Sequence, residues 1–576
     1  MWEAKIADID LSNGKIKVKN LDKKLAKNYL GGRGLGVKLL FDSIPPAIDP
    51  LSAENAIIFT VGPLTGIAPM SGRHAVISKS PLTNTIFDSS AGGFFGVELK
   101  HCGYASLIFK GMADSPVYIE IHNEDIDIKD GSKLWGLNVK ETINILSKKG
   151  RVACIGRAGE KLIKLANIIN DGNHACGRGG LGAVMGSKKL KAIIVNSSID
   201  LSLKPMNEKK YRHAEAQALR LIKASQALTK GLAEYGTPAL VNLMNHMRIL
   251  PANNFRERGF TRAEEISGEY IKENFELERK SCAKCAIGCK RVIKNSNLSI
   301  PEYETIWAFG ANLNNHDIRK IIEVNELCND YGIDTISTGA TLASYAELNN
   351  SEIKNLGELV KKVAEKKGVG EMLSEGSLAY CRAKEKPEAS MTVKALEIPA
   401  YDPRGLCGQA LAYATSNRGA CHLRAYMVAM EILGKPKLID RNTFTGKPAL
   451  VALIQNLSAA VDSLILCRFS SLALTEEEYA DLLSAAVGEE ITSQDLLTTG
   501  ERIWNLERLF NIREGFTCKD DKLPERFFSD GLSRKEFELA LREYYEIRGW
   551  SAEGVPLLNK LKALQLQSEA EKCGMK

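Results

Sequence analysis

The stretch Ala56-Ile-Ile-Phe-Thr-Val61 has the length and the apolar, β-branched composition of a buried strand. Similar runs recur through the first 200 residues, each bounded by glycine, proline, asparagine or aspartate. These runs are residues 74–78, 106–109, 117–121, 151–155 and 191–195. The pattern predicts a sheet-rich N-terminal domain over residues 1–203.

The pattern becomes helical from about residue 208, because apolar residues then recur three and four positions apart. One such helix covers residues 318–328, and we expect Asn314 or Asn315 to cap it and Gly332 to end it. Asp334 stands where the N-cap of the following helix belongs. Further predicted helices cover residues 371–384, 451–466 and 535–548.

A proline- and glycine-containing break at residues 399–408 divides the helical part in two. We therefore expect a helical domain over residues 204–392 and a second one over residues 393–576. The predicted fold class is α+β, with a sheet-rich domain followed by two mostly helical domains. No repeat of solenoid period is visible.

Composition indicates an ordinary globular protein of several domains, since the chain has 576 residues, of which 44% are hydrophobic and 26% charged. The net charge of +7 suits an acidic protein partner and is too small for a nucleic-acid-binding protein. Thirteen scattered cysteines in so long a chain are typical of a reducing compartment. With no signal pattern and no long apolar run, we expect a cytoplasmic protein without a membrane span.

Three cysteines lie close together in Ser281-Cys-Ala-Lys-Cys-Ala-Ile-Gly-Cys-Lys290. A cubane iron–sulfur cluster takes three thiolates from one such turn and a fourth from far away in sequence. Zinc and ordinary buried cysteines are the alternatives, although zinc sites usually show two separated ligand pairs. If a cluster forms, Cys467 is the candidate fourth ligand.

Glycine clusters occur at Gly31-Gly-Arg-Gly-Leu-Gly36, Ala91-Gly-Gly-Phe-Phe-Gly96 and Cys176-Gly-Arg-Gly-Gly-Leu-Gly182. Bare backbone of this kind either allows close packing or lets N–H groups approach a phosphate. The first cluster lacks the strand–helix–strand context of a Rossmann dinucleotide loop, so we reject that fold. Three clusters in one domain favour a large phosphate-bearing cofactor.

His422 stands among cations in Asn417-Arg-Gly-Ala-Cys-His-Leu-Arg424. Neighbouring positive charge is expected to keep the imidazole neutral at pH 7 and able to accept a proton, unless it is a structural histidine. Glu302 and Glu304 follow the cysteine run closely. Such acids are usually a solvated edge, but one carboxylate beside a cluster would serve as a proton carrier.

Taken together, the chain resembles the tungsten-containing aldehyde ferredoxin oxidoreductase family nearly from end to end. The strings that carry the resemblance are Gly31-Gly-Arg-Gly-Leu35, Gly62-Pro-Leu-Thr-Gly66, Lys79-Ser-Pro-Leu-Thr83, Gly177-Arg-Gly-Gly-Leu-Gly-Ala-Val-Met-Gly-Ser-Lys188, Gly332-Ile-Asp-Thr-Ile-Ser-Thr-Gly339, Ala400-Tyr-Asp-Pro-Arg-Gly405, Ala414-Thr-Ser-Asn-Arg-Gly-Ala-Cys-His422 and Gly500-Glu-Arg-Ile-Trp-Asn505. Many strings in one order make the match far more specific than any single glycine loop.

The resemblance implies an enzyme that oxidises an aldehyde to a carboxylic acid and passes the electrons to ferredoxin. It implies tungsten, or molybdenum, held by two pterins on the N-terminal domain, one [4Fe–4S] cluster, and Mg²⁺ between the pterin phosphates. A related tungsten enzyme acting on a non-aldehyde, such as an aromatic thioester, is the alternative.

By position, the resemblance assigns roles to particular residues. The implied cluster ligands are Cys282, Cys285, Cys289 and Cys467. The implied catalytic pair beside the metal is Glu304 and His422. The implied cofactor-binding residues are Arg73, Ser90, Gly92, Ala175, Gly177, Asn329, Asp334, Asp462 and Leu466.

The sequence departs from the family pattern at several places. Asn329 replaces a leading acid, Ile465 a glycine, Ser90 an asparagine and His174 an arginine. Glu323 remains where some members share a metal between subunits, with Glu326 three residues further on, but Gly357 falls near the histidine position. We therefore expect a monomer or a homodimer without a histidine-ligated bridging metal, with or without an electron-transfer subunit.

Overall fold

The computed structural model describes residues 4–198, 204–296 and 298–575. Its N-terminal region holds two six-stranded sheets. The first runs in the order β2 (Lys15–Asn20), β1 (Lys5–Asp10), β6 (Tyr104–Lys110), β3 (Ile57–Thr60), β4 (His74–Lys79) and β5 (Ile86–Ala91). The second runs in the order β11 (His174–Cys176), β10 (Ile168–Asn170), β9 (Arg151–Cys154), β12 (Leu190–Asn196), β7 (Val117–His122) and β8 (Asp125–Asp130). All six predicted strands are present.

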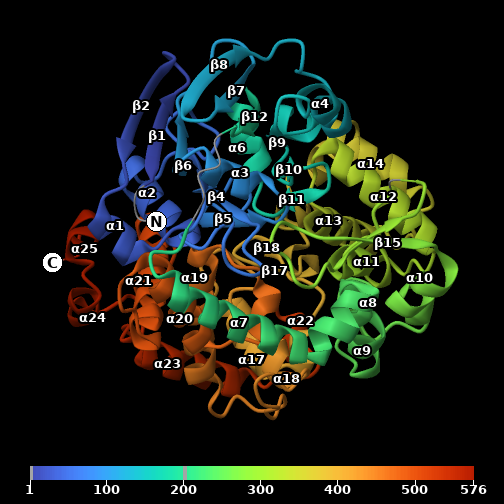
Figure 1. Ribbon diagram of the computed structural model, residues 1–576. Coiled ribbons are helices and arrows are strands. Elements are labelled where there is room, and N and C mark those ends of the chain that lie inside the picture. The colour runs from blue at the N-terminus through green and yellow to red at the C-terminus, as the bar shows by residue number, and fades with distance from the viewer. Residues whose placement is uncertain (1–3, 199–203, 297, 576) are drawn as a thin grey trace.

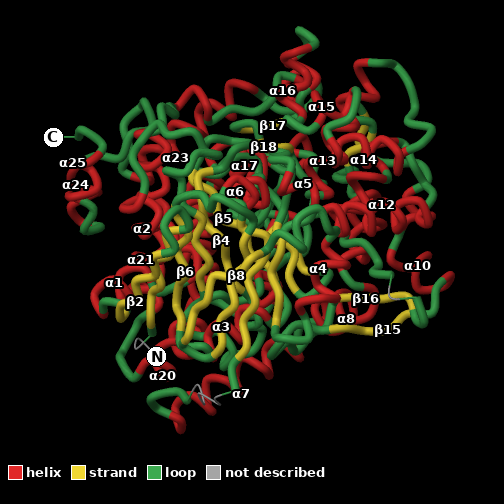
Figure 2. Tube along the Cα trace, turned by 90° about the horizontal axis from the view of Figure 1, so that it is seen from above, coloured by secondary structure: helices red, strands yellow, loops and turns green. Residues whose placement is uncertain are grey.

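Both sheets are mixed. β1 pairs with β6, and β12 with β7, in parallel, whereas the other neighbours are antiparallel. Every residue of β3 and β4 is buried, because both faces of the first sheet are covered. The rejection of a Rossmann fold is confirmed, and Figure 2 shows the strands side by side with helices around them.

The first glycine cluster forms the start of helix α2 (Gly32–Ser43) rather than a phosphate loop. A Cβ at Gly36 would lie 2.3 Å from Ile77 of β4, and one at Gly34 would lie 2.4 Å from the carbonyl oxygen of Tyr29. The glycines therefore let α2 pack closely on the sheet. Close packing is sufficient to explain this cluster, so it adds no independent support for a phosphate-bearing cofactor.

Helices make up most of the chain after residue 204 (Figure 1). The longer ones are α7 (Glu208–Ala224), α12 (Ile318–Tyr331), α13 (Thr335–Leu348), α14 (Leu356–Glu365), α17 (Cys407–Thr415), α19 (Lys447–Leu464), α20 (Glu476–Val487), α21 (Ser493–Arg513) and α23 (Arg534–Arg548). α19 packs against α21, α23 and α2, which brings the C-terminal part onto the first sheet. The α+β class is confirmed. The described helices include none that is long and apolar enough to cross a membrane.

Two helix predictions need correction. Asp317, not Asn314 or Asn315, caps α12, because its side chain accepts hydrogen bonds from the next turn, and Gly332 ends the helix as predicted. The helix predicted at 371–384 is split into α15 (Val369–Leu373) and α16 (Ser377–Ala383). Gly376, with φ +92°, breaks it. Asp334 caps α13, as predicted, by accepting a hydrogen bond from the N–H of Ser337.

The predicted domain boundary at residue 203 lies outside the described residues, and the one at residues 392–393 remains a prediction. A buried ionic network nevertheless joins distant parts of the chain. Arg33 of α2 contacts Glu507 of α21 at 2.7 Å and Asp462 of α19 at 3.3 Å. Arg424 contacts Asp462 at 3.1 Å and Asp88 of β5 at 2.8 Å. Each charge has an opposite partner, as burial requires.

Candidate active site

A cavity of about 370 Å³ lies where the N-terminal sheets meet the helical regions, and we call it the central cavity. It brings together most of the residues that the resemblance implied. Those lining it are Arg73, Ser90, Ala175, Gly177, Glu304, Asp334, His422, Asp462 and Cys467. Much of the remaining lining is aromatic or aliphatic, with Leu240, Tyr303, Tyr401, Leu423, Tyr426, Phe469 and Leu472.

All four predicted cluster cysteines line a second cavity of about 180 Å³, the thiol cavity. Cys282, Cys285 and Cys289 come from the loop between β15 (Leu277–Lys280) and β16 (Lys290–Ile293), and Cys467 follows α19. The Sγ of Cys285 accepts hydrogen bonds from two backbone N–H groups, those of Ile287 and Gly288. Arg73 and Cys467 line the central cavity as well, so the two cavities adjoin.

Met70 of the N-terminal region ties the two cysteine-bearing segments together. Its N–H donates to the carbonyl oxygen of Lys284 at 2.7 Å, and its carbonyl accepts from the N–H of Cys467 at 2.9 Å. Gly92 adds a second close contact, because a Cβ there would lie 2.7 Å from the Sγ of Cys282. Several stretches of chain that are distant in sequence therefore form this cavity.

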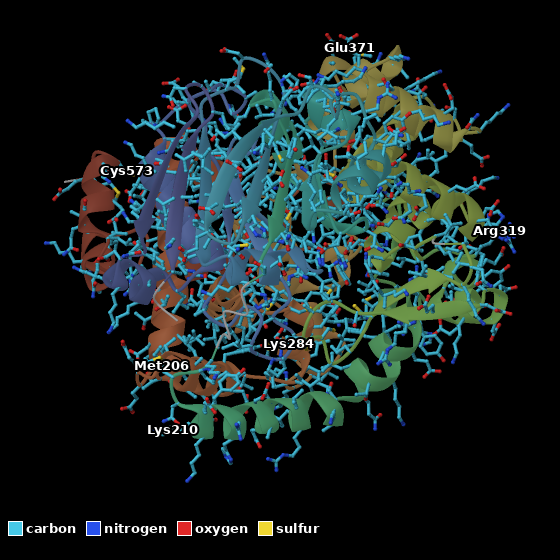
Figure 3. The ribbon with its side chains drawn as sticks, turned by 45° about the horizontal axis from the view of Figure 1, so that its top comes forward. Met206, Lys210, Lys284, Arg319, Glu371 and Cys573 are labelled. Atoms are coloured by element: carbon cyan, nitrogen blue, oxygen red, sulfur yellow. The ribbon has the colours of Figure 1, made fainter. Side chains whose placement is uncertain are left out.

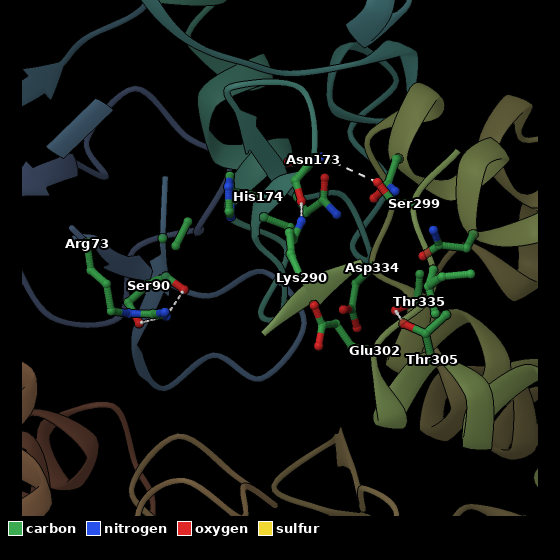
Figure 4. Close-up of a pocket in the computed structure, with 17 residues that line it drawn as sticks. Arg73, Ser90, Asn173, His174, Lys290, Ser299, Glu302, Thr305, Asp334 and Thr335 are labelled. Atoms are coloured by element: carbon green, nitrogen blue, oxygen red, sulfur yellow. Dashed lines mark hydrogen bonds between the residues drawn. The ribbon is translucent and has the colours of Figure 1, made fainter. Parts of the chain in front are cut away.

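A third cavity, of about 270 Å³, opens at the sheet edge. In Figure 4, Arg73 and Ser90 lie on one side of it and Glu302 and Asp334 on the other. Arg73 donates to both the carbonyl and the hydroxyl oxygen of Ser90 at 2.9 Å. The lining also includes the predicted residues Gly92, Ala175 and Asn329, and the substituted residue His174. Leu466 is not among the described residues that line any of the three cavities.

His422 and Glu304 lie side by side, with 3.6 Å between Nδ1 and Oε1. Neither atom has a hydrogen-bond partner within the described structure, although both are buried. Burial raises the pKa of Glu304 to about 8, against the opposing effects of the Ala400 N–H and Arg178. Burial, with help from Arg178 and Arg418, lowers the pKa of His422 to about 3. We expected a neutral imidazole because of the neighbouring cations. Burial lowers the pKa of His422 more than these cations do.

Tyrosine rings surround this pair. The ring centroid of Tyr401 lies 5.4 Å from that of His422, and the centroid of Tyr426 lies 6.0 Å from it. The two phenol oxygens are 3.1 Å apart, and Tyr303 packs against Tyr401. These rings fix the imidazole plane and keep the surroundings apolar. Our sequence reasoning missed them, although Tyr401 lies in the quoted string that begins at Ala400.

Besides Arg73 and Arg468, three further arginines line the central cavity and supply positive charge to it: Arg178, Arg418 and Arg424. The Nε atom of each is buried and lacks a hydrogen-bond partner in the described structure. Arg418 donates to the Sγ of Cys421 at 2.9 Å, and Arg418 and Arg424 together outweigh burial and lower the pKa of that thiol. Sequence reasoning could have singled out Arg178 and Arg418, because each lies inside one of the glycine-containing strings that carry the family resemblance.

Comparison with known proteins agrees with this geometry. Residues 6–197 match the model of the aldehyde ferredoxin oxidoreductase N-terminal domain, and residues 213–566 match that of domains 2 and 3 of the same family. The chain belongs to the aldehyde ferredoxin oxidoreductase family. It is an oxidoreductase, and the resemblance seen in the sequence is confirmed.

Two relatives in this family align over nearly their whole length. The chain is 42% identical to the tungsten-containing aldehyde ferredoxin oxidoreductase of Pyrococcus furiosus, over 96% of this chain and 97% of the relative. It is 41% identical to the enzyme of the same description from Thermococcus kodakarensis, over 95% and 96%.

Among solved structures, the active-site complex BamBC of benzoyl coenzyme A reductase, in complex with 1,5-dienoyl-CoA, has a chain of the same fold. The TM-score is 0.86 at 24% identity, and the alignment covers 99% of this chain and 98% of that one.

Proposed function

We propose that this family member oxidises an aldehyde to a carboxylic acid at a tungstopterin centre in the central cavity and transfers the electrons to ferredoxin through a [4Fe–4S] cluster. The observation that carries the proposal is the adjacency of the two cavities. Four thiols line one, His422 and Glu304 line the other, and Arg73 and Cys467 line both. A redox centre in the thiol cavity would therefore lie next to a redox centre in the central cavity.

The residues present fit these groups. Four cysteines around a cavity suit a cubane, in which each thiolate binds a different iron. Among the described residues, no three metal-binding side chains lie close enough together to hold one metal ion, so the four thiols are spaced more widely than a single zinc ion would require. The unpartnered Nε atoms of Arg178, Arg418 and Arg424 are donors suited to an anionic, phosphate-bearing cofactor.

Ser90, Gly92, Ala175 and Gly177 would hold the pterin phosphates, and Arg73 would bridge the cluster and a pterin. Asp334 and Asp462 would bond the pterin rings. Asp334 already uses Oδ2 as a helix cap. Its Oδ1 lies near Gly177, where a Cβ would approach to 3.1 Å. In this assignment Leu466 would add a backbone contact to the pterins, Asn329 would also bind the cofactor, and Mg²⁺ would lie between the phosphates near Ser90. The metal centre, when bound, supplies the two-electron chemistry.

The protein's own residues bind the substrate and move protons. The aromatic and aliphatic lining favours an apolar aldehyde and excludes bulk water. As the carbonyl carbon gains an oxygen from water, protons must leave, and neutral His422 is able to accept one. Glu304, when ionised, would receive this proton from His422. The 3.6 Å between the two side chains is longer than a hydrogen bond, but catalytic hydrogen bonds often tighten only when substrate is bound.

Metal analysis and a substrate panel on anaerobically purified protein test the proposal. We expect tungsten or molybdenum, two pterins and ~4 iron per chain, together with viologen reduction that depends on aldehyde. A preparation that holds these groups but turns over an aromatic thioester and no aldehyde would refute the proposed reaction. A preparation that holds zinc and no pterin would refute the proposed centre.

Gly92→Ala is expected to damage the cluster site. The new methyl would lie 2.7 Å from the Sγ of Cys282, closer than two such atoms approach, so this thiol must move. Iron should fall below the ~4 per chain of a complete cubane. The matched control is Gly231→Ala, because nothing lies within 4 Å of a Cβ at Gly231. Equal iron in the two variants would show that Cys282 is not held where the cluster needs it.

A further inference from the structure

The third cavity contains a lysine whose charge has no acidic partner. Lys290, the first residue of β16, lines this cavity and is half-buried. Among the described residues, no carboxylate oxygen lies within 4.0 Å of its Nζ. An exposed lysine needs no such partner, because water solvates its charge, as for Lys210 at the periphery of the molecule (Figure 3). A cation withdrawn from bulk water is normally paired with an anion.

The ammonium group of Lys290 belongs to the third cavity. Lys290 also lines the thiol cavity, but its Nζ donates a hydrogen bond to the carbonyl oxygen of Asn173 (Figure 4). Asn173 lines the third cavity and is not among the described residues that line the thiol cavity. An ammonium has three N–H donors, and this is the only hydrogen bond of Nζ within the described structure. Two donors therefore remain for a ligand in the third cavity.

The carboxylates of this cavity are engaged elsewhere. Glu302 and Asp334 are the carboxylates among the described residues that line it. Glu302 accepts a hydrogen bond from the hydroxyl of Thr237 at 2.5 Å, and Asp334 accepts one from the N–H of Ser337 at 2.7 Å. This leaves a ligand as the anionic partner of Lys290.

The rest of the lining suits a phosphate. In Figure 4, Arg73 and Ser90 lie to one side of Lys290, so that two cations and a hydroxyl surround the same space of about 270 Å³. Burial, together with the charges of Lys290 and Arg73, lowers the pKa of His174 well below its ordinary value, so this imidazole is uncharged at neutral pH. Lysine and arginine donate the charge-assisted hydrogen bonds that a phosphate group accepts.

We propose that Lys290 forms an ion pair with a phosphate group of the bound cofactor and so anchors the cofactor in the third cavity. This inference rests on the tungstopterin centre proposed above and adds to it a binding residue to which the sequence analysis gave no role. Lys290 binds and orients, and it takes no part in the redox step.

Removal of this charge from the complete enzyme tests the proposal. In Lys290→Met we expect pterin to leave the folded protein on the order of 10-fold faster than in the wild type, because hydrogen bonds between charged groups are lost. Pterin that stays with the protein through anaerobic gel filtration is measured by its fluorescence after oxidation. Iron in the same samples should stay at ~4 per chain, since every cysteine is kept.

The matched control is Lys280→Met. Lys280 lies opposite Lys290 in the β15–β16 hairpin and is exposed. It is not among the described residues that line the third cavity or the thiol cavity. Release of pterin from this variant should equal that from the wild type. Equal rates in Lys280→Met and Lys290→Met would overturn the ion pair.

Restoring the charge separates an ion pair from a structural role. His174 lines the same cavity and stands where the sequence departs from the family pattern by replacing an arginine. We expect slow release of pterin to return in Lys290→Arg or in the Lys290→Met, His174→Arg double variant. Fast release in both, or loss of iron from Lys290→Met, would overturn the proposal. Wild-type protein without any pterin would instead refute the proposed centre on which it rests.

Discussion

His422→Asn protein is expected to oxidise aldehydes ~10²–10⁴-fold more slowly than the wild type, which is the usual cost of losing a positioned proton carrier. The amide keeps a polar side chain but has no basic nitrogen to accept a proton. Anaerobic turnover with viologen measures the rate, and metal analysis of the same sample measures tungsten and iron. Normal turnover, or a loss that only follows lost tungsten, would contradict the role of His422.

Glu304 gives this prediction a pH signature. Its pKa is raised to about 8, so the carboxylate forms only as the pH rises through that value, whereas His422 is neutral throughout. If ionised Glu304 receives the proton, kcat/KM should increase between about pH 7 and pH 9 in the wild type. Glu304→Gln should be slow and should lack this rise. A rise that persists in Glu304→Gln would assign it to another group.

Cys467→Ala protein is expected to lose the complete cluster and nearly all electron transfer to ferredoxin. A cubane needs four protein thiolates, and Cys467 is the proposed ligand from outside the β15–β16 loop. The measurement is iron content together with the electron paramagnetic resonance signal that appears on reduction. A full signal in Cys467→Ala would show that the fourth ligand lies elsewhere.

The control for this variant is another partly buried cysteine. Cys518 is half-buried and is not among the described residues that line the thiol cavity. Cys518→Ala should keep ~4 iron per chain and wild-type turnover. A loss of iron in this variant as well would indicate general instability rather than a missing ligand.

Some parts of the fold and site were accessible from sequence because they depend on local chemistry. Short apolar runs bounded by turn residues predicted the strands at 57–60 and 190–196 correctly. Asp334 was recognised as a cap because an aspartate before a helix can satisfy a free N–H. The convergence of Cys467 with the cysteine loop came from the family resemblance, since no local pattern links it to residue 282.

Other parts depend on contacts between distant segments. The glycines of α2 serve close packing against Ile77 and Ser463, which a glycine-rich string cannot distinguish from a phosphate loop. The raised pKa of Glu304 depends on its burial in the folded chain, so the string Pro-Glu-Tyr-Glu indicated a candidate proton carrier but not the direction of its pKa shift. The aromatic surroundings of His422 likewise require Tyr401 and Tyr426 to meet in space.

The position of Met70 bears on how the enzyme matures. One residue of the N-terminal region bonds the backbone of both cysteine-bearing segments, and the fourth thiol belongs to a segment that is synthesised late. A nascent chain that has emerged only through the cysteine loop presents three thiols and lacks the fourth. We therefore expect the proposed cluster to be inserted after translation, when a folded apoprotein, rather than a growing chain, is the recipient of iron and sulfide.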